Sequence, residues 1–170
     1  EINMESISTR RITKAGVVAA IYVVLTVSLS ALSYGGIQFR IAEALMLLCL
    51  FSKDYVVSLT IGCFIANIFS TVGAVDTIVG TSATLIAGLC IYLLRNKLNY
   101  FTASLFPVII NGVFVGLELW IVLKLPLVLS MVQVAAGELV CVTILGGILL
   151  KALSKNRGFM AMITNEKESI

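Results

Sequence analysis

The sequence predicts an all-α integral membrane protein: a bundle of six transmembrane helices with both termini in the cytoplasm. Three observations predict this fold class. The chain of 170 residues is 59% hydrophobic and only 12% charged, its mean hydropathy is +1.07, and its apolar segments are long. We expect cytoplasmic tails at residues 1–11 and 154–170, and one membrane domain at residues 12–153.

Six apolar segments are predicted to be helices, because a membrane-spanning helix needs about 20 mostly apolar residues. The second is too short to span the bilayer alone. Pro107 is expected at the start of the fifth helix or as a kink in its first part, and Pro126 suits the first turn of the sixth. The segments cover residues 12–32, 41–51, 55–70, 76–94, 101–123 and 126–153.

The basic residues predict the orientation, since cytoplasmic loops of membrane proteins carry an excess of Lys and Arg. If six helices cross alternately from a cytoplasmic N-terminus, only Arg40 and Lys124 fall at outer ends. The residues at inner ends are Arg10, Arg11, Lys14, Lys53, Arg95, Lys97, Lys151, Lys155, Arg157 and Lys167.

Polar side chains within the apolar segments are the candidate binding residues, because a charge inside a bilayer costs roughly 3 kcal/mol or more unless it faces a cavity or a partner. Under the predicted topology these residues fall in the outer half of the membrane, and Asn111 near the middle is the comparable residue of the inner half. This distribution predicts a pocket open to the outside rather than a channel. The candidates are Arg40, Glu43, Asn67, Asp76, Glu118, Trp120, Gln133 and Glu138.

The charge balance of these candidates predicts the ligand chemistry. Glu43, Asp76, Glu118 and Glu138 accompany a single internal arginine, Arg40. Unless burial protonates them, the pocket favours a cation or a ligand rich in hydrogen-bond donors. A carboxylate accepts two parallel N–H donors, which suits a guanidine-like or guanine-like edge, and a second carboxylate suits an ammonium group.

Several candidates also have purely structural interpretations. Arg40 and Glu43, three residues apart, suit a pair on one helix face. Asp76 suits a helix N-cap, and Asn67 suits a cap or a bridge between helices.

The remaining candidates have alternatives as well. Glu118 lies near the predicted interface, where it can be solvated, and Trp120 suits an interfacial anchor as well as a surface that stacks on a planar ligand. Glu138 is the hardest to explain structurally, because it lies about 12 residues into an apolar helix.

Enzymatic chemistry is disfavoured by what the sequence lacks. It contains no histidine, its four cysteines form no C-x-x-C pair, and no phosphate-binding G-x-x-x-x-G-K-[ST] motif is present. We therefore predict no metal, no cofactor, no nucleophile–base pair and no ATP hydrolysis by this chain.

Four stretches of the sequence resemble the QueT family. They are "FRIAEALMLLCLF", "GCFIANIFSTVGAVDTIVGTSATLIAG", "INGVFVGLEL" and "GEL", and the first two with their spacing are the specific part. The resemblance covers about residues 15–153. QueT proteins are substrate-binding S components of energy-coupling factor (ECF) transporters, assigned to queuosine precursors.

The resemblance implies a six-helix S-component fold and a substrate such as 7-aminomethyl-7-deazaguanine, which combines a guanine-like edge with an ammonium group. It also implies partners: a scaffold transmembrane protein and two ABC-type ATPases that supply the hydrolysis. S components typically dock on the scaffold through an A-x-x-x-A motif on the first helix, which Ala15 and Ala19 match. The family mechanism is toppling of the loaded bundle, with inward release of the ligand.

Rival functions remain open from the sequence. The chain can be an S component for another vitamin-like ligand, or a stand-alone secondary carrier coupled to protons through Glu118 and Glu138. A membrane scaffold without transport activity is a third possibility, in which the polar residues only join helices. An intramembrane enzyme is the least favoured.

Overall fold

The computed structural model describes residues 2–34 and 38–164, and this part of the chain is helical throughout apart from short connections. The all-α prediction is therefore confirmed. In chain order the elements are α1 (Ile2–Ser28), α2 (Ser30–Ser33), η1 (Ile41–Leu50), α3 (Lys53–Asn67), α4 (Ala74–Leu94), η2 (Arg95–Lys97), α5 (Tyr100–Leu123), α6 (Leu127–Glu138), η3 (Leu139–Gly146), α7 (Gly147–Ser154) and α8 (Arg157–Ile163).

Four helical stretches of the described residues are long and apolar enough to cross a membrane: Arg11–Ser28, Ala74–Lys97, Tyr100–Leu123 and Leu127–Ser154. Two predicted segments are shorter. The 15 residues of α3 make a helix of about 22 Å, and the 10 residues of η1, a 3-10 helix, extend about 20 Å. Neither reaches across a hydrocarbon core of roughly 30 Å by itself.

The termini of the chain differ from the sequence prediction. Residues 2–11, expected to be a tail, form the first turns of α1, and the first predicted segment is interrupted after Ser28. Residues 157–163 of the predicted C-terminal tail form α8. Residues 165–170, including Lys167 from the topology prediction, lie outside the described residues.

Local sequence signals place the helix ends. The Ser52 side chain accepts a hydrogen bond from the backbone N–H of Asp54 and caps α3, and Asn99 forms a capping box with Thr102 at the start of α5. Lys124 ends α5 in the left-handed conformation, with φ of 57°. Pro126 follows as the N-cap of α6, while Pro107 lies inside α5 rather than at its start.

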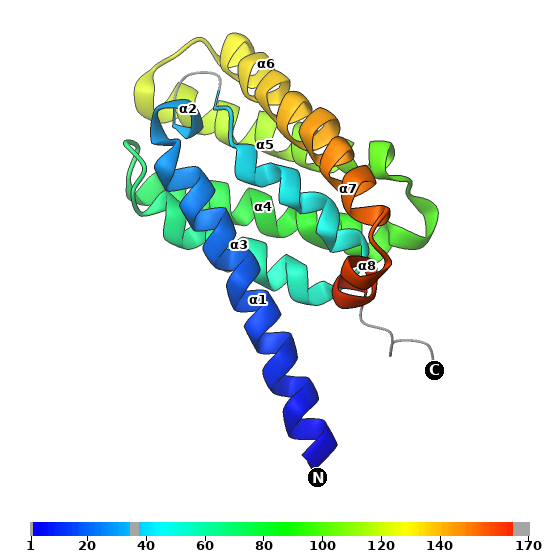
Figure 1. Ribbon diagram of the computed structural model, residues 1–170. Helices are drawn as coiled ribbons and strands as arrows, with labels where there is room; N and C mark the ends of the chain where they lie inside the picture. Colours follow the sequence, from blue (N-terminus) through cyan, green and yellow to red (C-terminus); the bar gives the residue numbers. More distant parts are fainter. Residues whose placement is uncertain (1, 35–37, 165–170) are drawn as a thin grey trace.

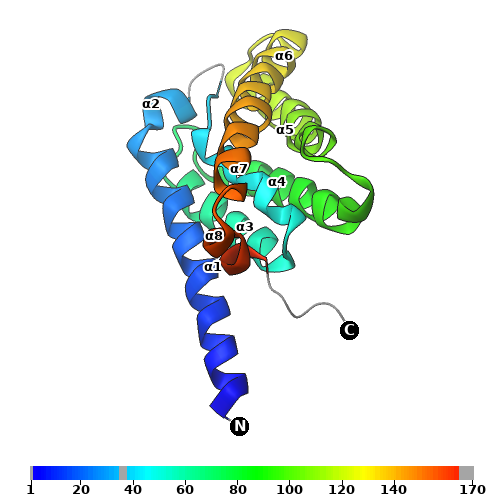
Figure 2. The ribbon, with the colours of Figure 1, turned by 45° about the vertical axis from the view of Figure 1, so that its right-hand side comes forward.

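The short helix η1 lies at the centre of the bundle. Helices α1, α3, α4, α5 and α6 pack successively against one another, and η1 contacts α1, α3, α4, α5, η3 and α7. Figure 1 shows η1 in cyan between α1 and the chain of α6 and α7, and Figure 2 shows the N-terminal turns of α1 extending beyond the other helices. Because it is surrounded, η1 buries Met46 and Leu47 almost completely.

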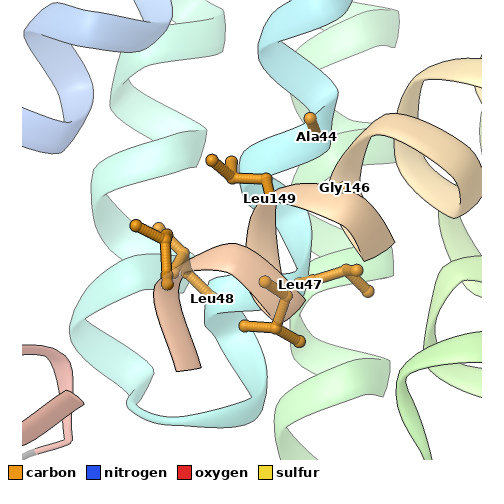
Figure 3. A pocket seen from close by; sticks show the side chains of 7 residues that line it. Ala44, Leu47, Leu48, Gly146 and Leu149 are labelled. Carbon is orange, nitrogen blue, oxygen red and sulfur yellow. The ribbon is translucent and has the colours of Figure 1, made fainter. Parts of the chain in front are cut away.

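A glycine permits the closest approach to η1. A Cβ atom on Gly146 would lie 2.9 Å from the carbonyl oxygen of Ala44, so a side chain there would separate the two backbones. Figure 3 shows this contact, with Leu47 and Leu149 beside it around a narrow apolar cleft. The last turns of η1 are thus held by apolar packing, and its polar residues stand at the other end.

The two ends of the bundle differ in charge. We call the end where α3 and α5 begin and α4 and α7 end the basic end. The other end, where α3 and α5 end and α4 and α6 begin, holds the candidate binding residues considered next. The basic end carries Lys53, Arg95, Lys97, Lys151 and Lys155.

Candidate functional site

Arg40 forms a buried ion pair with Asp76. One terminal nitrogen of the guanidinium lies 2.9 and 3.2 Å from the two carboxylate oxygens, and the two side chains are only 4% and 1% exposed. Arg40 immediately precedes η1 and Asp76 lies in the first turn of α4. The alternatives of an Arg40–Glu43 pair and of Asp76 as an N-cap are therefore wrong, and Gly73 is the N-cap of α4.

Asn67, the last residue of α3, bridges to the same ion pair. Its side-chain amide donates to the backbone carbonyl of Asp76 at 3.0 Å, while its Oδ1 atom is buried without a hydrogen-bond partner. Gly80 leaves the space that these groups occupy. A Cβ atom there would lie 2.5 Å from Asn67 Nδ2, 3.0 Å from Asp76 Oδ1 and 3.3 Å from a terminal nitrogen of Arg40.

Glu43 lies in the first turn of η1 and is completely buried. The hydroxyl group of Tyr22, from α1, donates to Glu43 Oε1. The other carboxylate oxygen, Oε2, has no hydrogen-bond partner. Tyr22 is itself fully buried, so this contact joins the first helix to the interior of the site.

Glu138 and Glu118 complete the set of buried carboxylates. Asn111 of α5 donates to Glu138 Oε1 at 3.0 Å, and Glu138 Oε2 is unpaired. Glu118 is 3% exposed, so the solvated interpretation of Glu118 is wrong, and neither of its oxygens has a hydrogen-bond partner in the described part of the chain. Both residues lie within electrostatic range of Arg40.

We call these side chains the Arg40 cluster. They come from the segment before η1, from η1 itself and from α1, α3, α4, α5 and α6. The members are Tyr22, Arg40, Glu43, Asn67, Asp76, Asn111, Glu118 and Glu138.

The chemical character of the cluster is set by its unpaired acceptors. Among the described residues, oxygens of Glu43, Asn67, Glu118 and Glu138 are buried without hydrogen-bond partners, and so is the Nε donor of Arg40. Buried polar atoms are normally hydrogen-bonded, and each unpaired one costs roughly 1–3 kcal/mol. A ligand with several N–H donors and a positive charge would satisfy these oxygens.

Tyr34 covers Arg40 from outside the four long apolar helices. Its ring centroid lies 5.9 Å from the guanidinium carbon, which is within range of a cation–π contact. Its hydroxyl donates to the backbone carbonyl of Ala66. Burial raises the pKa of Tyr34 to about 12, so the phenol keeps the proton that it donates.

Two predicted site residues are not brought into the cluster. Trp120 is 47% exposed on α5, as expected of an interfacial anchor. Gln133 is half-buried on α6 and forms no hydrogen bond with another described residue. Among the residues that the structure describes, no group of histidine, cysteine and acidic side chains is placed to hold a metal ion.

The predicted docking pair lies on a partly covered face of α1. Ala15 and Ala19 are both half-buried, and a Cβ on Gly62 of α3 would lie 3.0 Å from the Ala19 carbonyl oxygen. The neighbouring pair with the same spacing, Gly16 and Ala20, is exposed.

Sequence reasoning missed Tyr22, Asn111 and Gly80. The sequence does not indicate Tyr22 as a site residue, because a tyrosine in an apolar helix usually lies at the membrane interface. Asn111 did stand out as the isolated polar residue of the inner half, which was the available signal. Nothing in the local sequence distinguishes Gly80 from the other glycines.

Comparison with known proteins decides the family. The family described as QueT transporter matches residues 12–155. The chain belongs to this family. A QueT relative, the "Queuosine precursor transporter QueT" of Lactococcus lactis subsp. cremoris (strain MG1363), is 36% identical over 167 residues, covering 89% of this chain and 96% of the relative. No solved structure matches the chain. Membership of the QueT family and four apolar helices identify a multi-pass membrane protein with a transport role.

Proposed function

We propose that this chain is the substrate-binding S component of an ECF-type importer and captures the queuosine precursor 7-aminomethyl-7-deazaguanine from outside the cell. The observation that carries the proposal is the set of unpaired carboxylate oxygens around Arg40. The name of the 36% identical relative, a queuosine precursor transporter, supports the same substrate class.

The ligand edge and the cluster are chemically complementary. The guanine-like edge presents a ring N–H and an exocyclic amino group, and a carboxylate accepts such a pair of donors side by side. Glu43 and Glu138 are the candidates for this edge. Each has one unpaired oxygen, and its other oxygen, which accepts one hydrogen bond from Tyr22 or Asn111, has a second lone pair for the neighbouring donor. The unpaired Asn67 Oδ1 would accept a further donor.

The ammonium group of the ligand needs a carboxylate that is not already neutralised. Asp76 is engaged by Arg40, whereas both oxygens of Glu118 are unpaired. We therefore assign the ammonium to Glu118 rather than to Asp76. Asp76 holds Arg40 in place instead. Trp120 and Gln133 remain candidates only if the ligand-bound state repositions them.

The proposed arrangement in the membrane has six passes with both termini in the cytoplasm and the Arg40 cluster near the outer face. The accumulation of lysine and arginine at the basic end supports this orientation. A scaffold transmembrane protein would dock on α1 at Ala15 and Ala19, and two ABC-type ATPases would supply the energy. The short η1 and α3 cross the bilayer only where their neighbours or a locally thinner membrane complete the span.

Titration calorimetry on the purified chain in detergent tests the substrate. We expect one-to-one binding of 7-aminomethyl-7-deazaguanine, with guanine at least ten-fold weaker because it lacks the ammonium, and no binding of thiamine. Binding of thiamine or another vitamin in place of the deazaguanine would reject this substrate while leaving the S-component role open. No binding of any of them by folded protein would reject both.

Reconstitution tests the importer mechanism separately. Liposomes that contain the chain with its scaffold and ATPases should accumulate ligand only when ATP is supplied. Liposomes that contain the chain alone should not accumulate it under a pH gradient. Uptake by the chain alone would instead establish a proton-coupled carrier.

A further inference from the structure

A concave site lies at the basic end, away from the Arg40 cluster. It is a groove of about 370 Å³, which we call the Lys151 groove. This volume is within the range of small-molecule and cofactor pockets. The residues that line it are Phe51, Tyr100, Gly147, Leu150, Lys151 and Ser154.

The lining changes from apolar to polar along α7. Gly147, Leu150, Lys151 and Ser154 recur at the spacing of one helix face. Gly147 begins α7 and Ser154 ends it, so the polar side chains stand at the end of a long apolar stretch. A Cβ on Gly147 would already touch the ring of Tyr100, at 4.0 Å from Cδ2, and the missing side chain keeps the groove open.

The groove opens onto apolar surface. Its neighbours Phe101 and Ile148 are 54% and 62% exposed, and both belong to helices that are apolar enough to cross a membrane. Tyr100 is also exposed, at 59%, which is typical of an aromatic residue at the membrane interface. A molecule bound in the groove would therefore contact the hydrocarbon of the bilayer on one side and the Lys151 side chain on the other.

The charge around the groove is positive. No acidic residue lines it. Lys155 and Arg157 follow Ser154 in the chain, and Lys97 precedes Tyr100 by three residues. The nearest acidic residue along the chain from Phe51, Asp54, is paired with Arg11.

We propose that the Lys151 groove binds an anionic phospholipid, with its phosphate at the Lys151 ammonium and one acyl chain against Leu150 and Phe51. Basic pockets between transmembrane helices are suited to such headgroups, and a lysine near the membrane surface contributes about 1 kcal/mol, or roughly five-fold in affinity. The polarity gradient along α7 follows that of a lipid from acyl chain to headgroup. This inference does not rest on the proposed substrate.

Native mass spectrometry of the full chain in detergent tests the lipid site, with dioleoylphosphatidylglycerol and dioleoylphosphatidylcholine added in equal amounts. We expect the wild-type chain to retain phosphatidylglycerol preferentially. Lys151→Gln should weaken its retention about five-fold. Lys155→Gln is the matched control, because it removes an exposed charge that does not line the groove, and should weaken retention clearly less than Lys151→Gln.

Two further measurements separate a lipid site from general attraction to charge. Gly147→Val should lower retention of phosphatidylglycerol by filling the groove while keeping every charge. Soluble glycerol phosphate should fail to compete. Equal retention of the two lipids, equal losses in the two lysine variants, or full competition by glycerol phosphate would each overturn the proposal.

Discussion

Two arginine–aspartate ion pairs lie at opposite ends of α3 and differ in hydrogen-bond geometry and in exposure to solvent. At the basic end, Arg11 donates from two nitrogens to the two oxygens of Asp54, at 2.8 and 2.7 Å, and the side chains are 42% and 24% exposed. At the other end, Arg40 uses one nitrogen toward Asp76 and leaves its Nε unpaired, although both residues are buried.

The ion pair with the better hydrogen-bond geometry is thus the exposed one, which contributes less to the stability of the fold. An exposed ion pair contributes about 1 kcal/mol or less, while a buried pair must offset the desolvation of both charges and needs every hydrogen bond to do so. The Arg40 cluster leaves its pair incompletely bonded and surrounds it with unpaired carboxylate oxygens. The proposed ligand would supply the hydrogen bonds that are missing at this end of the molecule.

Substituting the aspartate of each ion pair should give the largest difference between the two pairs, measured as loss of stability. Asp76→Asn removes the carboxylate charge that is hydrogen-bonded to the buried Arg40, and we expect a loss of about 3–5 kcal/mol in the free energy of unfolding. Asp54→Asn should cost about 1 kcal/mol at most. Unfolding in mixed detergent micelles measures both, and similar losses in the two variants would remove the distinction between the pairs.

Adding one methyl group to α4 sharpens the comparison. Gly80→Ala would place a Cβ 2.5 Å from Asn67 Nδ2 and 3.0 Å from Asp76 Oδ1, which are fixed by hydrogen bonds. We expect it to cost about 1–3 kcal/mol in stability and to weaken ligand binding.

Gly88→Ala, two turns further along the same helix, is the matched control. Its Cβ would meet the apolar side chains of Val56, Cys49 and Met46 at 3.2, 3.4 and 3.7 Å, so only Val56 must shift, by a few tenths of an ångström. Ligand affinity should therefore be retained in this variant. If Gly80→Ala binds as tightly as Gly88→Ala, the space at Gly80 is not needed by the site.

A pair of tyrosines provides the smallest test. Tyr22→Phe removes the donor to Glu43 at the cluster, and Tyr55→Phe removes a 3.2 Å hydrogen bond to the Ile163 carbonyl near the basic end. Tyr55→Phe should cost about 1 kcal/mol in stability, and Tyr22→Phe about 1–2 kcal/mol because it leaves a buried Glu43 oxygen without its donor. Calorimetry should find weaker ligand binding only for Tyr22→Phe, and equal affinities in the two variants would contradict a specific role of the Tyr22–Glu43 contact in binding.

The sequence was sufficient to predict an all-helical membrane chain and its buried charges, but not the count of six spanning helices, since the described residues contain four helices long enough to cross a membrane. Long apolar segments follow directly from composition, and ionisable residues such as Glu138 stand out against them. The structure buries both Glu138 and Glu118, and their role in binding stays a prediction. The lengths of α1 and α3 could not be predicted as well, because helix ends depend on capping contacts and packing rather than on hydropathy.

The ion-pair and hydrogen-bond partners of the charged residues could not be predicted from the sequence. Arg40 is three residues from Glu43 and 36 from Asp76, and local spacing favours the nearer pair. The choice is made by the packing of η1 into the centre of the bundle. The contact between Tyr22 and Glu43 likewise depends on tertiary structure, since it joins residues 21 positions apart.

The most direct test of the central claim is titration calorimetry of Glu138→Gln with 7-aminomethyl-7-deazaguanine. Glutamine keeps the oxygen that accepts from Asn111 and replaces the unpaired carboxylate oxygen with an amino group, so the fold is preserved while the acceptor is lost. A charge-assisted hydrogen bond contributes roughly 1.5–3 kcal/mol, so affinity should fall about ten-fold or more relative to the wild-type chain. Equal affinity in the two proteins would contradict the assignment of the Arg40 cluster as the substrate site.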